Sequence, residues 1–353
     1  MKSFFDQLAA SLTAGELVVV ATIVGTIGPV PRGVGTKMVV RPDGVLGGTV
    51  GGGSGETIVC RLAGEVLAAG RPRRVVVPLA PAGSDLSPAA TIEVFLDPWQ
   101  GPAALALAEA IRDGLAAGRA VALATTVRSA DAVGWPLGRK MLLADPAPQE
   151  VAPWPVSFAA AGEALAAGQA YAQLHTIAAD DPAVPAAGAT IEALVEVFVP
   201  PLTLLLVGAG HIAQPLAAIA KLLGYEVVVL DDRPALATAE RFPTADRLLI
   251  GDPLALLREY PITPRCHVVI APPEHAQADA CLREVIASAA GYVGLVASRQ
   301  RAAAIRAALV EAGVSAERLA LLHSPVGLAI GAQTPAEIAV SIAAQLVHVG
   351  RTV

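Results

Sequence analysis

The sequence predicts an α/β protein with two parts, an internally duplicated N-terminal α/β domain at residues 1–200 and a second domain with a doubly wound parallel sheet at residues 201–353. Three observations predict this fold class. The first 200 residues contain a repeat, the residues after 201 alternate apolar strands with helical stretches, and the glycine turn 208-GAGHIA-213 joins the first of those strands to the first of those helices.

The repeat relates residues 18–40 to residues 121–143 at an offset of 103. The matched pairs include Ala21 with Ala124, Thr22 with Thr125, Gly35 with Gly138, Lys37 with Lys140 and Met38 with Met141. The same offset aligns 93-EVFLDP-98 with 196-EVFVPP-201, whereas 63-AGEVLAAG-70 matches 161-AGEALAAG-168 at an offset of 98. We therefore expect two copies, about residues 1–100 and 101–200, each with a helix, alternating strands, a glycine turn, another helix and a closing strand.

Two features occur in the first copy alone, and a feature that only one copy keeps is a candidate for function. They are Pro31-Arg32 and the glycine cluster Gly51, Gly52 and Gly53; the second copy has Gly134-Trp135 and 152-APWP-155 instead. The alternative is that the second copy has simply lost a turn.

The glycine cluster precedes Ser54 and a helix expected to begin near Glu56. Consecutive glycines at a helix N-terminus can turn their amides towards an anion. Arg32 and Lys37 could add positive charge to the same phosphate. Two alternatives remain open: Ser54 as N-cap of a plain turn with surface cations, and a structural role for Lys37, which Lys140 matches.

The second half reads as a Rossmann-like domain. Gly208 would make the tight turn after the strand 202–207, Gly210 would let the backbone approach a pyrophosphate, and the small Ala213 would allow close packing. We expect His211 and Ile212 to lie at the ligand with the amides of the helix N-terminus. Further strands are expected at 226–232, 247–250, 266–271 and 292–297, with helices starting near 253, 274, 298 and 335.

Asp231 lies 23 residues beyond Gly208, where a carboxylate can take the hydroxyls of a ribose, and Asp232 follows it. An acid at this place favours a nucleotide with a 2′-OH over one with a 2′-phosphate, although the neighbouring Arg233 weakens that inference. The alternative is a scaffold of this fold that binds no nucleotide.

His323 ends a further strand expected at 319-LALLHS-324, at the edge where a doubly wound sheet binds ligands. It is a candidate general acid or base, and a capping or core histidine is equally compatible with the sequence. Glu337 reads as the acid of a capping box, with Thr334 at the N-cap and Pro335 at the first helical position.

Composition excludes several classes of protein. The net charge is −6 and no basic run occurs, which argues against nucleic-acid binding. Three cysteines without a CxxC argue against a disulfide scaffold or a sequence-local zinc site and fit a reducing cytoplasm. The N-terminal residues do not read as a signal peptide, and the longest apolar run, residues 17–30, is too short to cross a membrane.

The motifs 30-VPRGVGTKM-38, 48-GTVGGGSGE-56, 292-YVGLVASRQRAAAIRAAL-309 and 323-HSPVGLAIGAQTPAEIAVSIAAQL-346 together resemble the XdhC/CoxI family of maturation factors for molybdenum hydroxylases. The resemblance covers nearly the whole chain. It implies a Rossmann-like C-terminal domain and a protein that binds the molybdenum cofactor, molybdopterin, protects it and helps to insert it into xanthine- or aldehyde-oxidising enzymes.

The chain departs from the family pattern at four places. Ser54 stands where the family usually has a cysteine, a second family cysteine is replaced near Pro88, 272-PPEH-275 replaces a Thr-His pair, and Ala329 replaces an aspartate. A molybdenum ligand or a sulfur relay would need a soft thiolate, which serine does not offer. Recognition of a phosphate or pterin is less affected, because it needs amides and basic side chains.

The leading hypothesis is an XdhC-like factor that hands the cofactor to a molybdenum hydroxylase of the xanthine dehydrogenase type, without turnover of its own and without a metal site. The alternatives are an NAD(P)-dependent oxidoreductase that uses His323, and a non-catalytic regulatory subunit. We expect a cytoplasmic homodimer that binds neither nucleic acid nor a membrane. In the leading hypothesis both glycine clusters contact one anionic ligand in an interdomain cleft.

Overall fold

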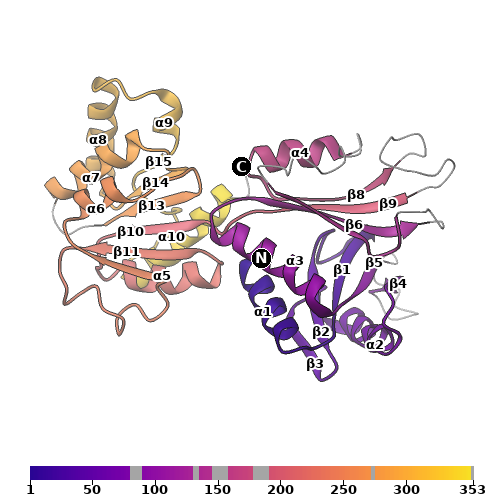
Figure 1. Ribbon diagram of the computed structural model, residues 1–353. Helices are drawn as coiled ribbons and strands as arrows, with labels where there is room; N and C mark the ends of the chain where they lie inside the picture. The colour runs from indigo at the N-terminus through magenta and orange to yellow at the C-terminus, as the bar shows by residue number, and fades with distance from the viewer. Residues whose placement is uncertain (80–89, 130–134, 145–157, 178–190, 272–274, 351–353) are drawn as a thin grey trace. The chain divides into compact units, whose positions relative to one another are not determined.

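The structure is a computed structural model that describes the chain except for residues 80–89, 130–134, 145–157, 178–190, 272–274 and 351–353. The chain divides into two compact units, Met1–Pro200 and Pro201–Val353 (Figure 1). The expected fold class is confirmed, because the first unit contains antiparallel sheets with helices and the second contains one parallel sheet.

The first copy of the repeat forms a five-stranded sheet in the order β3-β2-β1-β5-β4. Its strands are β1 (Val18–Ile27), β2 (Lys37–Arg41), β3 (Gly44–Gly48), β4 (Arg73–Pro78) and β5 (Thr91–Trp99), and all neighbours run antiparallel. Helix α2 (Gly53–Ala69) buries Val59, Ala63 and Val66 against one face of this sheet.

The second copy forms a four-stranded sheet in the order β7-β6-β9-β8, with helix α4 (Ala159–Ala166) on one face. The strands are β6 (Val121–Ser129), β7 (Lys140–Ala144), β8 (Tyr171–Ile177) and β9 (Ile191–Phe198). Helices α1 (Lys2–Thr13) and α3 (Gly101–Ala116) share a core cluster with residues of both sheets, among them Val20, Leu123 and Phe198.

Strand register supports the duplication and corrects one of its details. Thr22 pairs with Lys37 and Thr125 pairs with Lys140, as the offset of 103 requires. In the closing strands, however, Thr22 also pairs with Phe95, whereas Thr125 pairs with Leu194. The structural counterpart of Phe95 is therefore Leu194, and the alignment of the two EVF segments is wrong by four residues.

A shift by four residues leaves every side chain of a strand on its original face, because side chains alternate with a period of two. The apolar pattern of the closing strands therefore fits both alignments equally well, which explains the error. With the corrected register Glu93 corresponds to Glu192, and Asp97 corresponds to Glu196.

The second unit is a six-stranded parallel sheet in the order β12-β11-β10-β13-β14-β15. Its strands are β10 (Thr203–Val207), β11 (Glu226–Asp231), β12 (Arg247–Ile250), β13 (Cys266–Ile270), β14 (Tyr292–Leu295) and β15 (Leu322–His323).

Helices cover both faces of this sheet, as a doubly wound fold requires (Figure 1). Helices α5 (Ala213–Leu222) and α10 (Pro335–Gly350) pack on one face. Helices α6 (Pro253–Glu259), α7 (His275–Ala287), α8 (Arg299–Glu311) and α9 (Ala316–Ala320) pack on the other. Cys266 and Cys281 lie in the core.

Helix-capping side chains account for one corrected and one confirmed prediction in the second unit. The strand expected at 319–324 is wrong in its first half, because α9 occupies residues up to Ala320 and only Leu322–His323 form β15; the Ser315 side chain caps α9 by accepting the Arg318 amide. The capping box of α10 is confirmed, since Glu337 accepts the Thr334 amide and donates its own amide to the Thr334 hydroxyl. Among the described residues no helix is long and apolar enough to cross a membrane.

Candidate functional site

The glycine cluster of the first unit forms the turn between β3 and α2. Gly51, Gly52 and Gly53 have φ values of 128°, 77° and 62°, a region that side-chain-bearing residues rarely adopt. Gly52 is the N-cap of α2, with ψ at −173°, so the helix begins at Gly53 and not near Glu56. The alternative that Ser54 caps this helix is therefore wrong.

Glu56 already satisfies part of this turn with a carboxylate oxygen. Its Oε2 accepts hydrogen bonds from the Thr49 hydroxyl at 2.5 Å and from the amides of Val50 and Gly52, both at 3.2 Å. The Gly51 amide donates to the Thr49 hydroxyl at 3.1 Å. The turn thus binds an anionic group of its own chain. The amides of residues 53–55, in the first turn of α2, have no intrahelical acceptor because of their position.

The exposed glycines Gly52 and Gly53 and the exposed Ser54 line a pocket of about 380 Å³, together with Gly51 and Pro31. Arg32 lies next to this turn, since a Cβ built on Gly51 would be 2.9 Å from Pro31 Cγ and 3.9 Å from Arg32 Cγ. The fold therefore brings Pro31-Arg32 and the glycine cluster together, although about twenty residues separate them in the sequence.

Arg32 is exposed and lines a second, larger pocket of about 760 Å³. Gly48 and Thr49, which precede the glycine cluster, line the same pocket, and Tyr171 and Phe198 contribute from the second copy. The segment from Gly48 to Gly53 thus borders both of these pockets.

Lys37 also borders the larger pocket, but its ammonium is bound within the chain. Its Nζ lies 2.7 Å from Glu196 Oε2 and donates to the Thr22 hydroxyl at 2.9 Å, and its side chain is 8% exposed. The second copy repeats this arrangement, because Lys140 Nζ lies 2.8 Å from Asp97 Oδ2. Each lysine therefore pairs with a carboxylate of the other copy.

Burial dominates the protonation of both carboxylates in these pairs. Desolvation raises the pKa of Glu196 above its ordinary value, although Lys37 acts in the opposite direction. Desolvation likewise raises the pKa of Asp97 against the effect of Lys140. Lys37 and Lys140 occupy equivalent positions in the repeat, and each forms an ion pair that joins its own copy to the other.

The glycine turn presents no thiolate. Ser54 offers a hydroxyl, and Cys60, two helical turns further along α2, is half-buried. Burial, with a smaller contribution from Glu56, raises the pKa of Cys60 and disfavours its thiolate. The described residues contain no group of three or more His, Cys, Asp or Glu side chains that could hold a metal ion. The second cysteine replacement, near Pro88, lies outside the described residues.

In the second unit the turn 208–213 follows β10 directly and leads into α5. Gly208 has φ at 106°, and the space at Gly210 is open, since no heavy atom lies within 4 Å of a Cβ built there. His211 is exposed, and Ile212 occupies the N-cap position of α5. These residues lie at the carboxyl end of a central strand, where parallel sheets of this kind bind ligands.

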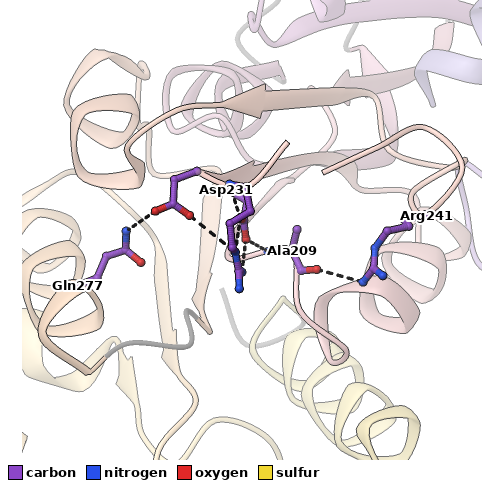
Figure 2. Close-up of polar contacts among 6 residues, drawn as sticks. Ala209, Asp231, Arg241 and Gln277 are labelled. Carbon is purple, nitrogen blue, oxygen red and sulfur yellow. Dashed lines mark hydrogen bonds and ion pairs between the residues drawn. The ribbon is translucent and has the colours of Figure 1, made fainter. Parts of the chain in front are cut away.

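Asp231 and Asp232 differ sharply in environment. Asp231 is 1% exposed, and its carboxylate accepts the Ala209 amide at 2.5 Å and three hydrogen bonds from Arg233: its amide at 2.8 Å, Nε at 2.8 Å and Nη2 at 2.7 Å (Figure 2). The side chain of Asp232 is 50% exposed. Burial alone would raise the pKa of Asp231, but the hydrogen bonds from Arg233 and Ala209 outweigh it and hold this pKa below its ordinary value.

Sequence reasoning missed one cation at this turn. Arg241, from the connection between β11 and β12, donates through Nη2 to the Ala209 carbonyl at 3.4 Å (Figure 2). Its Nε is buried without a hydrogen-bond partner within the described part of the chain. No spacing rule identifies this residue, because it lies in an irregular connection between two strands.

His323 lies half-buried in β15, with its ring stacked on Tyr292 at a centroid distance of 4.7 Å. Burial, with the nearby Arg306, lowers the pKa of His323. Its ring extends a row of aromatic contacts through Tyr292 and His267 to Tyr225. His275 is the first residue of α7.

Comparisons with known proteins agree with this division of the chain. Residues 11–78 match the model of the XdhC and CoxI family, and residues 204–346 match the model of the XdhC Rossmann domain. A solved structure of a protein named xanthine dehydrogenase, from Bacillus halodurans, superimposes with a TM-score of 0.77 and 25% identity, covering 99% of this chain and 96% of the other.

Two curated relatives match smaller shares. A Bacillus subtilis protein, named as a probable subunit of xanthine dehydrogenase, is 33% identical over 42% of this chain and 43% of its own length. The uncharacterized protein YqeB of Escherichia coli is 37% identical over 41% of this chain and 27% of its own length. The match thus spans less than half the length of either relative. With both family models matched and a full-length structural counterpart, the chain belongs to the XdhC and CoxI family.

Proposed function

We propose that this protein is an accessory factor of a xanthine dehydrogenase type of enzyme, and that it binds the molybdenum cofactor and delivers it to that enzyme. One observation carries the proposal: the segment matched to the XdhC and CoxI family contains the glycine turn and Arg32, which the fold brings together beside a pocket. The names of the Bacillus relatives support the choice of client enzyme.

The residues present fit one end of the cofactor better than the other. Molybdopterin carries a phosphate and a pterin ring, and the exposed amides at the start of α2 with the Arg32 guanidinium would hold such an anion. Glu56 already takes the amides of Val50 and Gly52, so the phosphate would be held by the amides of residues 53–55 and by Arg32. The dithiolene-bound metal would find no thiolate at Ser54, so this chain would hold the cofactor by its organic part. The bound cofactor supplies the redox chemistry of the client enzyme.

The test is co-production of the full chain with molybdopterin, followed by assay of the pterin that copurifies. Arg32→Ala should lower the bound pterin about tenfold to a hundredfold, because a hydrogen bond to a charged group contributes about 1.5–3 kcal/mol. Arg119→Ala removes an exposed cation elsewhere in the same unit and should leave the pterin content unchanged.

Gly52→Ala should also lose the pterin, because alanine is strained at a φ of 77° and a ψ of −173°. Gly33→Ala is its control, since Gly33 has no positive φ and open space at its Cβ. Wild-type protein that retains no pterin, or an Arg32 variant that binds as well as the Arg119 variant, would rule out the proposed site.

A second candidate function is an NAD(P)-dependent oxidoreductase, favoured by the turn at Gly208 and Gly210 with Asp231 on the adjacent strand. His323 would serve as its acid or base, and its lowered pKa would keep the ring neutral at pH 7. Substrate-dependent oxidation of NADH or NADPH that is abolished in His323→Asn would support this candidate, and its absence would exclude it.

A further inference from the structure

Two carboxylates lie at the end of β11, beside the glycine turn of the second unit. Only one of them has hydrogen-bond acceptor positions that a ligand can use. A carboxylate has about four acceptor positions. Asp231 uses them for the Ala209 amide and for three hydrogen bonds from Arg233. A ribose hydroxyl would therefore find no acceptor on Asp231, although the sequence spacing assigns that role to it.

Asp232 has the opposite properties. Its polar contacts within the described part of the chain are long: Gln277 Nε2 lies 3.5 Å from Oδ2, and Arg233 Nε lies 3.7 Å from Oδ1. Its side chain is 50% exposed, against 2% for the side chain of Asp231. Because Arg233 forms short contacts with Asp231, the negative charge of Asp232 is weakly compensated where β11 ends.

Gln277 shows where this carboxylate lies in the sheet. Asp232 follows β11, and Gln277 lies in the first turn of α7, which follows β13. These two strands flank β10 on either side. The hydrogen bond between Asp232 and Gln277 therefore joins the residue that follows β11 to the first turn of α7, across the end of β10, the strand that leads into the glycine turn (Figure 2). A doubly wound sheet binds the ribose of a nucleotide at this position.

We infer that Asp232 is the ribose-recognising residue of this turn and that the second unit binds a nucleotide with a pyrophosphate and an unmodified ribose 2′-OH. Asp232 accepts the hydroxyl, Gln277 donates from the opposite side, and the amides after Gly210 take the pyrophosphate. A 2′-phosphate would bring negative charge against Asp232 and is rejected. Arg233 positions Asp231 and takes no part in binding a 2′-phosphate. This inference concerns the second unit and does not depend on cofactor binding by the first.

Calorimetric titration of the full chain with four ligands tests the inference. NADH and ADP have an unmodified 2′-OH, whereas NADPH and adenosine 2′,5′-bisphosphate carry a phosphate there. NADH and ADP should each bind at least tenfold more tightly than the 2′-phosphorylated ligands. Equal affinities, a preference for the 2′-phosphorylated ligands, or failure of all four to bind would overturn it.

Asp232→Asn separates recognition from folding, because the two cofactors should respond in opposite directions. NADH affinity should fall about tenfold or more with the loss of a charged acceptor, and NADPH affinity should rise as the repulsion disappears. Glu311→Gln removes one exposed carboxylate from α8 in the same unit and should change neither affinity. A parallel loss of both cofactors in Asp232→Asn, or no change, would contradict the assignment.

Discussion

His267 illustrates how one buried residue makes the stability of the second unit depend on pH. Its ring is 5% exposed and accepts or donates a hydrogen bond with the Tyr225 hydroxyl at 3.1 Å. Burial, with smaller effects of Arg265 and His323, lowers the pKa of His267 from 6.5 to about 4. The folded protein therefore keeps this imidazole neutral at a pH where the unfolded chain is already protonated.

We predict that the free energy of unfolding falls between pH 6.5 and pH 4 through this residue. The unfolded state binds more protons in that window, so stability is full above pH 6.5 and decreases by up to about 3 kcal/mol as the pH approaches 4. Urea unfolding of the full chain, followed by circular dichroism at several pH values, should show a shallower dependence in His267→Gln. His211→Gln, at an exposed histidine, should keep the wild-type slope; equal slopes in all three proteins would contradict the prediction.

Part of the candidate site in the second unit could be predicted from the sequence. The turn of Gly208 and Gly210 could be predicted because six consecutive residues determine it. The different environments of Asp231 and Asp232 could not, since both are aspartates at the end of one strand. The Asp231 carboxylate is bound by Ala209 and Arg233 whereas the Asp232 side chain is half exposed, and these environments depend on residues outside the strand. Arg241 was missed for a similar reason, because only the folded connection brings it to Ala209.

Among the elements, the turn between β3 and α2 depends on one side chain of the helix that follows it. Glu56 Oε2 accepts hydrogen bonds from Thr49, Val50 and Gly52, and its charge lies at the positive end of the helix dipole. The sequence could predict that glycines form this turn. It could not predict that the chain provides its own anion there, because a glutamate in the first turn of a helix is common.

We predict that Glu56→Ala loosens this turn without unfolding the unit. Three hydrogen bonds to a partly exposed carboxylate contribute about 1–2 kcal/mol together, which corresponds to roughly tenfold faster exchange of the local amides. Hydrogen–deuterium exchange of a peptide that covers residues 45–60 measures this change. Glu65→Ala, at an exposed position of the same helix, should leave exchange at the turn unchanged. Protection that is equal in both variants would contradict the role of Glu56.

The two copies of the repeat are joined within the first unit by reciprocal contacts, in which a residue of each copy pairs with a residue of the other. Lys37 pairs with Glu196 and Lys140 pairs with Asp97, each across the copies. A Cβ built on Gly35 would lie 3.5 Å from Glu196 Oε1 and one built on Gly138 would lie 3.4 Å from Asp97 Oδ1, so the two glycines repeat the reciprocal arrangement. The repeat in the sequence predicted two similar copies. It could not predict their partners, because the alignment of the closing strands by similarity separated Asp97 from Glu196 by four residues.

We predict that breaking one of these pairs destabilises the unit far more than removing both of its members. Glu196→Gln leaves the Lys37 ammonium buried without its counter-charge, which should lower the free energy of unfolding by about 3–5 kcal/mol. Lys37→Met combined with Glu196→Leu should recover most of that loss, because two apolar side chains replace a desolvated ion pair.

Urea unfolding followed by tryptophan fluorescence measures this cycle in the first unit, since Trp99, Trp135 and Trp154, the three tryptophans of the chain, all lie within residues 1–200. Glu65→Gln disturbs an exposed ion pair of the same unit and should cost less than about 1 kcal/mol. If the reciprocal pairs link the copies, Asp97→Asn should lower the free energy of unfolding as much as Glu196→Gln does, because Lys140 then loses its counter-charge in the same way. A Glu196 variant as stable as the Glu65 control, or a double variant no better than the single one, would show that the two copies are held together by their apolar contacts alone.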